Sequence, residues 1–152
     1  MADLTIVSNT QEIKRGIELV DSGSLDLAAQ YFKQLQDQDR GANPVVASFV
    51  GMLKALRDNQ PFQGLEICKK AVSQDEDEPL CYLNLAKVYM DMDDRYHAVK
   101  TIHKGLKYHH PSREHLFDFY KSIGIRRKAP VGFLDRNHPV NKLLGKMTYK
   151  GA

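Results

Sequence analysis

The chain has 152 residues, enough for about one domain with a single hydrophobic core. Apolar residues make up 42% and charged residues 27%, which excludes a wholly disordered or collagen-like chain. The net charge of +3 combines two unequal parts: residues 126–152 carry 7 basic and 1 acidic side chains, a net of +6, whereas residues 1–125 carry 15 basic and 18 acidic ones, a net of −3.

Helical periodicity, prolines and polar turns predict an all-α protein. Helices are expected near residues 10–21, 25–38, 44–57, 61–74, 79–91, 94–108 and 112–123, and no convincing strand remains. Pro44, Pro79 and Pro111 stand at three of the expected helix starts, where the missing amide of proline does no harm and its fixed φ favours the helix. Gly124 is expected to end the last helix.

The first six of these helices carry a pattern that recurs roughly every 34 residues, the period of helix-turn-helix repeats. The three copies are Gly16-x2-Leu19, Ala28-x3-Phe32-x2-Leu35 and Pro44; Gly51, Gly64-x3-Cys68-x2-Ala71 and Pro79; and Tyr82-x2-Leu85-Ala86-x2-Tyr89, Ala98-x3-Ile102, Gly105 and Pro111. Small residues keep the register: Gly16, Gly51 and Ala86 are 35 residues apart, and Ala28, Gly64 and Ala98 are 36 and 34 apart. We expect two helices to cross closely at these positions, which therefore serve packing.

The order aromatic-x2-Leu-small-x2-aromatic, followed by Ala-x3-large and Pro, resembles the tetratricopeptide repeat (TPR) family. The resemblance implies a right-handed superhelical α-α solenoid of three TPR-like helix hairpins, at about residues 9–43, 44–78 and 79–111, with a capping helix at 112–123. Residues 1–124 would form this helical domain, and residues 125–152 a basic C-terminal extension. It also implies a binding scaffold, because TPR proteins usually hold a partner in a concave groove lined by the first helix of each pair.

The residues expected to line that groove lie three or four positions apart on one face of each first helix. They are Ile13, Ile17, Val20, Val45, Ser48, Met52, Leu80, Leu83, Lys87 and Met90, with Leu56 at the margin. Such a groove is apolar and suits an amphipathic helix or a short peptide, although an apolar stripe is also the usual sign of a core. The cochaperones of this family clamp a terminal carboxylate with inward Lys, Arg and Asn side chains. Asn84 and Lys87 alone do not make that clamp, so a carboxylate-ended chaperone tail is not the expected ligand.

The basic extension mixes charged and apolar residues. Its basic side chains are Arg126, Arg127, Lys128, Arg136, Lys142, Lys146 and Lys150. Val140, Leu143, Leu144 and Met147 share one face of a short helix expected after Pro139. Three interpretations stay open: the extension covers its own repeats, contacts another protein, or meets a membrane or nucleic-acid surface.

An enzyme would need convergent reactive groups, and the best candidates are the histidines, His97, His103, His109, His110, His115 and His138. Asp93 with His97, and His110 with Glu114, have the i,i+4 spacing of metal ligands but lack an evident third ligand. No P-loop, GxGxxG, HExxH, GxSxG or kinase motif set occurs. We therefore expect no catalysis, no cofactor and no metal.

The expected location is the cytoplasm. No apolar run approaches the ~20 residues needed to cross a bilayer, and residues 1–15 lack the basic start and apolar stretch of a signal peptide. Cys68 and Cys81 form no CxxC motif, which suits a reducing compartment.

The leading functional hypothesis is a non-enzymatic protein-protein interaction scaffold, adaptor or chaperone-like, that binds a helix or peptide of a protein partner in the apolar groove. The alternative is a recruitment module whose basic extension contacts an anionic membrane or nucleic acid, and strong weakening by salt would favour it. The third hypothesis is a homo-oligomer that assembles through the repeats.

Overall fold

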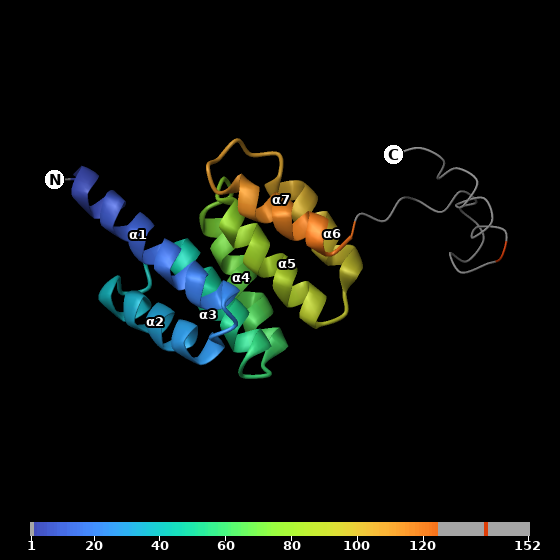
Figure 1. Cartoon of the computed structure of the whole chain (residues 1–152), viewed down its shortest axis with the longest axis horizontal. Coiled ribbons are helices and arrows are strands. Elements are labelled where there is room, and N and C mark those ends of the chain that lie inside the picture. The colour runs from blue at the N-terminus through green and yellow to red at the C-terminus, as the bar shows by residue number, and fades with distance from the viewer. Residues whose placement is uncertain (1, 125–138, 140–152) are drawn as a thin grey trace. The chain divides into compact units, whose positions relative to one another are not determined.

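The computed structural model describes residues 2–124, with side chains from residue 10 onward, and residue 139. Within residues 2–124 the chain is all-helical, with seven α-helices and no strand (Figure 1). They are α1 (Ala2–Asp21), α2 (Leu25–Gln38), α3 (Pro44–Leu56), α4 (Pro61–Gln74), α5 (Pro79–Asp91), α6 (Arg95–Gly105) and α7 (Arg113–Ser122). The expected helix after Pro139 and the basic side chains from Arg126 to Lys150 lie outside the described residues.

The predicted helix limits are confirmed to within a few residues except at the start of α1, and the place of Pro111 also differs from the prediction. Helix α1 begins at Ala2, well before the expected start near residue 10. Pro111 does not begin α7, which starts at Arg113. The backbone N–H of Arg113 donates to the carbonyl of His110 (3.0 Å), so Pro111 occupies the second position of a turn, where its fixed φ is equally suitable.

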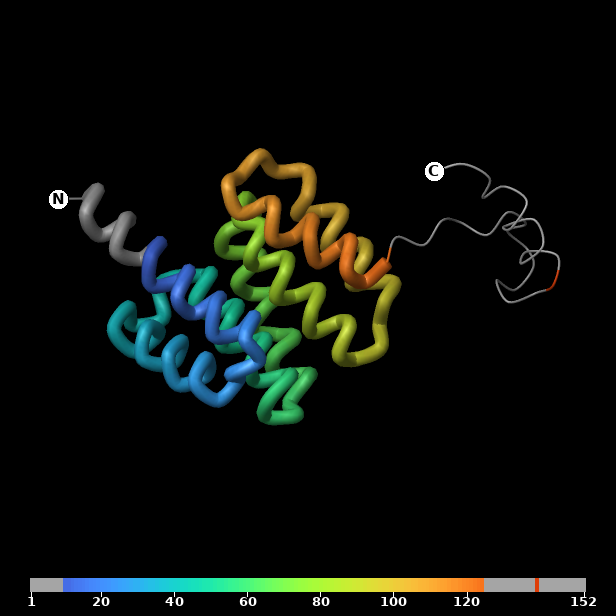
Figure 2. Tube along the Cα trace, viewed as in Figure 1, coloured from blue at the N-terminus to red at the C-terminus, as the bar shows by residue number. Residues whose placement is uncertain are grey.

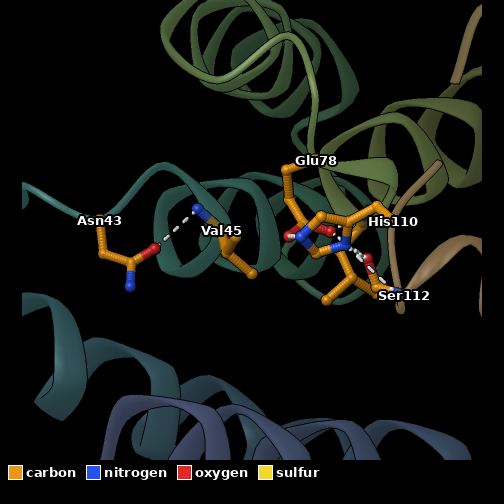
Figure 3. A network of polar contacts seen from close by, with 6 residues as sticks. Asn43, Val45, Glu78, His110 and Ser112 are labelled. Carbon is orange, nitrogen blue, oxygen red and sulfur yellow. Dashed lines mark hydrogen bonds and ion pairs between the residues drawn. The ribbon is translucent and has the colours of Figure 1, made fainter. Parts of the chain in front are cut away.

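Local chemistry sets most of the helix starts. Pro44, Pro61 and Pro79 each occupy the first turn of their helix. The side chain of Asn43 accepts a hydrogen bond from the N–H of Val45 (2.9 Å) at the start of α3 (Figure 3). At the starts of α5 and α6, the capping side chains are the carboxylates of Glu78 and Asp94, which likewise accept hydrogen bonds from backbone N–H groups of the first turn.

Helix α5 lies at the centre of the packing. Each helix from α1 to α6 packs on the next one, and α3 and α7 also pack on α5 (Figure 2). Helix α5 therefore touches α3, α4, α6 and α7. Nine residues of α5 are buried, among them polar Asn84, as expected for a helix with neighbours on several sides.

Close helix crossings occur at the repeated small residues, as predicted. A Cβ atom at Gly64 of α4 would lie 2.4 Å from the carbonyl oxygen of Gly51 in α3, and one at Gly16 of α1 would lie 2.3 Å from the ring of Phe32 in α2. Ala28, Ala86 and Ala98 are fully buried. These contacts assign the recurring small residues to packing.

Candidate functional site

Two adjoining pockets lie among α1, α3, α5 and α7. The first, of about 320 Å³, is lined by Ile17, Val20, Asp21, Phe49, Leu80, Leu83, Lys87, His115, Asp118, Phe119 and Ser122. The second, of about 380 Å³, is lined by Val20, Leu25, Met52, Leu56, Lys87, Met90, Asp91 and Phe119. Because the two share Val20, Lys87 and Phe119, we treat them as one surface, called here the groove.

Most of the side chains expected at a groove line this one: Ile17, Val20, Met52, Leu56, Leu80, Leu83, Lys87 and Met90. They differ in exposure. Met52 is 0% exposed and Leu80 and Leu83 are 6% exposed, so they form the floor, whereas Ile17, Val20 and Met90 are partly exposed. The accessible apolar surface therefore comes mainly from the partly exposed side chains.

Three of the expected residues line neither pocket. Ile13 is partly exposed on α1, and Val45 is buried in the first turn of α3. Ser48 belongs to the core, where its hydroxyl donates to the carbonyl of Val45 (2.7 Å) and accepts a hydrogen bond from the Asn84 amide (2.8 Å). The expectation that Ser48 faces a partner is wrong, because a fully buried hydroxyl bonded on both sides has no free surface.

Helix α7 contributes side chains that the sequence analysis missed. It was expected only to cap the repeats, yet His115, Asp118, Phe119 and Ser122 all line the first pocket. The available signal was the spacing of three residues between Phe119 and Leu116, which is 0% exposed. That spacing puts both on one face of the helix, directed toward the other helices.

Lys87 is the basic residue at the middle of the groove. Its ammonium lies 5.8 Å from the centre of the Phe119 ring, within cation-π range, and has no ion pair within 4 Å among the residues the structure describes. Burial lowers the pKa of the Lys87 ammonium, and the nearby Asp21 carboxylate opposes part of this shift. The protein thus holds a partly desolvated cation on a surface that is mainly apolar.

Outside the groove, a cluster of polar side chains connects two turns of the chain. Glu78, at the start of α5, accepts hydrogen bonds from the N–H of Leu80 (2.9 Å) and from the hydroxyl of Ser112. The His110 ring approaches the same carboxylate, with its Nε2 atom 3.5 Å from Oε2 (Figure 3). The cluster ties the turn before α5 to the turn before α7, which is a structural role.

His97 and His103 contact separate neighbours. His97 contacts the Asp94 carboxylate (2.6 Å), and His103 contacts the Tyr120 hydroxyl (3.1 Å). Within the described part of the chain, no three His, Cys, Asp or Glu side chains are grouped so as to hold a metal ion.

Comparison with known proteins assigns no relative. No family model matches the chain, and no curated protein matches its sequence. None of the helices in residues 2–124 combines the length and apolar character needed to cross a membrane.

Proposed function

We propose that the chain is a non-enzymatic scaffold of the TPR type that binds a helix or peptide of a protein partner in the groove. In this proposal α1–α2, α3–α4 and α5–α6 are the three repeats and α7 is the cap. The repeating pattern of residues supports it, as do the close crossings at Gly16, Gly51 and Gly64 and the packing of α5 on both α3 and α7.

The observation that carries the proposal is where the groove lies. It is formed mainly by the first helix of each proposed pair and the cap, with Leu25 at the start of α2 as the exception. This is the face that stacking of repeats leaves free. Its lining is mainly aliphatic and aromatic, which suits the apolar face of a helix. Met90, which is partly exposed, adds a flexible thioether side chain that adapts to more than one shape.

A matched pair of substitutions on one helix tests the proposal. Phe119 lines both pockets, whereas Phe117, two residues earlier on α7, lines neither and is 43% exposed. Peptides selected by phage display on the wild-type chain would be titrated, by fluorescence anisotropy, against Phe119→Asp and Phe117→Asp. We expect Phe119→Asp to weaken binding by about tenfold or more, as for a central apolar anchor, and Phe117→Asp to change it little.

Equal effects of the two substitutions, or none from either, would overturn the proposal that the groove is the binding site. A thermal melt of each variant separates lost binding from lost folding. Phe117 makes the comparison stringent, since it is the same residue type and also lies near a lysine ammonium (4.9 Å from Lys121).

A further inference from the structure

Two of the helices that form the groove end in a residue of unfavourable charge. The last residue of α1 is Asp21 and the last residue of α5 is Asp91, and neither helix has a basic residue in its last turn. A helix C-terminus carries partial negative charge, so a carboxylate there is repelled, whereas a lysine or arginine would be stabilised. Both side chains are exposed and both line the groove.

The second pocket lies where three helices end. Val20, Leu56 and Met90 line it, and each is the last or next-to-last residue of α1, α3 or α5. Amides of the following turns bond to some of the terminal carbonyls, such as the N–H of Gly23 to the carbonyl of Val20 (3.0 Å). The Asp91 carboxylate is therefore the larger negative charge at this pocket, and Asp21 lines the adjoining one.

Within the described residues the two carboxylates lack a close ion-pair partner, although the Lys87 ammonium attracts Asp21. Neither Asp21 nor Asp91 has an ion pair within 4 Å among the described residues. The third acidic residue of the groove, Asp118, is already paired with Lys121 (2.7 Å). Lys54, in the last turn of α3, lines a separate pocket between α2 and α3. Lys87 lies between the two pockets, and its pKa is lowered by burial despite the attraction of Asp21.

We propose that the groove is selective for an amphipathic helix that carries Lys or Arg beside its apolar face, placed so that these cations lie against Asp21 and Asp91. The inference rests on the proposed function, because it names the chemistry of the partner at the same site. The partly exposed apolar side chains of the groove account for affinity. The two carboxylates account for the choice among apolar helices and for the direction of the bound helix in the groove.

Two synthetic peptides of about five helical turns test this choice. They share one apolar face of Leu and Ala, and their polar positions are Lys in one and Glu in the other. Their dissociation constants for the full chain would be measured by fluorescence anisotropy from about 50 mM to about 500 mM NaCl. We expect the Lys peptide to bind about tenfold or more tightly at the lower salt concentration.

The same titration with charge-removing variants locates the effect. The double variant Asp21→Asn, Asp91→Asn is expected to weaken the Lys peptide by about fivefold and to leave or improve the Glu peptide. The control is Asp37→Asn, Asp77→Asn, which removes two exposed carboxylates outside the groove. Equal weakening by both double variants would show general attraction to an acidic surface and would overturn the inference.

The other outcomes separate the inference from the proposed function. If both peptides bind equally and Phe119→Asp weakens both, the groove binds helices without charge selection, and only the inference fails. If neither peptide binds, both fail. If the unliganded chain self-associates in light scattering, and Phe119→Asp abolishes this while Phe117→Asp does not, a second copy is the occupant and the inference is overturned.

Discussion

Replacing Gly64 by alanine is expected to destabilise the protein although alanine is the better helix former. A Cβ atom at this position would lie 2.4 Å from the carbonyl oxygen of Gly51 and 2.8 Å from the Cβ of Ala55. Even a close carbon-oxygen contact is about 3.3 Å long, so the Cβ atom would be too close to the oxygen by about 1 Å. Helices α3 and α4 would have to move apart by nearly that distance. The obstructing oxygen is a backbone atom inside a helix, so no rotamer change relieves the contact.

The expected change follows from two opposing effects. Overpacking of a core costs about 1–3 kcal/mol, and a contact with fixed backbone belongs at the upper end of that range. The gain in helix propensity from glycine to alanine is about 1 kcal/mol. We therefore expect Gly64→Ala to lower the free energy of unfolding by about 2 kcal/mol, measured by urea denaturation followed by far-UV circular dichroism.

The neighbouring exposed residue provides the control. Gln63→Ala changes the same helix one residue earlier without entering the crossing, and it is expected to alter stability by less than about 0.5 kcal/mol. If Gly64→Ala proved as stable as the wild type, or more stable, the close approach of α3 and α4 would be refuted, and with it the packing role assigned to the repeated small residues.

Three further results are expected. Ser48→Ala should lower the free energy of unfolding by about 1–3 kcal/mol, because it removes the hydrogen bond to the Asn84 amide group, whose Oδ1 already lacks a partner among the described residues. Adding Asn84→Leu should recover part of this loss, as a double-mutant cycle measured by urea denaturation would show. Cys68 and Cys81 should not react with a thiol reagent at pH 8 until the chain is unfolded, since burial raises both thiol pKa values, that of Cys81 to about 12. Because burial makes the pKa of Lys87 lower in the folded than in the unfolded chain, the wild type should gain stability relative to Lys87→Met as pH rises through the folded pKa toward 10.5. A flat difference in the free energy of unfolding from about pH 7 to 10.5 would contradict this.

The helix limits were predictable because they depend on local chemistry. Asn43 with Pro44, and Glu78 with Pro79, mark helix starts through a capping oxygen and a fixed φ, whatever the rest of the chain does. The turn at Pro111 shows the limit of that reasoning. A proline suits both the first turn of a helix and the second position of a β-turn, and only the bond from Arg113 to His110 distinguishes them.

The division between core and groove was not predictable from periodicity. Met52 and Ile17 satisfy the same helical spacing, yet one is 0% exposed and the other partly exposed, because exposure depends on which other helices reach that face. Ser48 could be placed in the core only once Asn84, 36 residues away, was known to bond to it. Phe119 was missed for a related reason: a cap that also forms a wall of the groove has the same amphipathic pattern as a cap that does not.

The floor of the groove is more tightly packed than its walls. This difference determines at which residues the binding specificity of the groove can change. The floor is built from α3 and α5, and α5 packs against four other helices, so a substitution at Leu83 disturbs the core as well as the binding surface. The walls are α1 and α7, which present Val20 and Phe119 as partly exposed side chains. A partly exposed side chain can change size with little cavity or overpacking cost, whereas one that is 6% exposed cannot. Variation at Val20 and Phe119 should therefore alter partner choice while the fold is kept, and variation at Leu83 should alter both together.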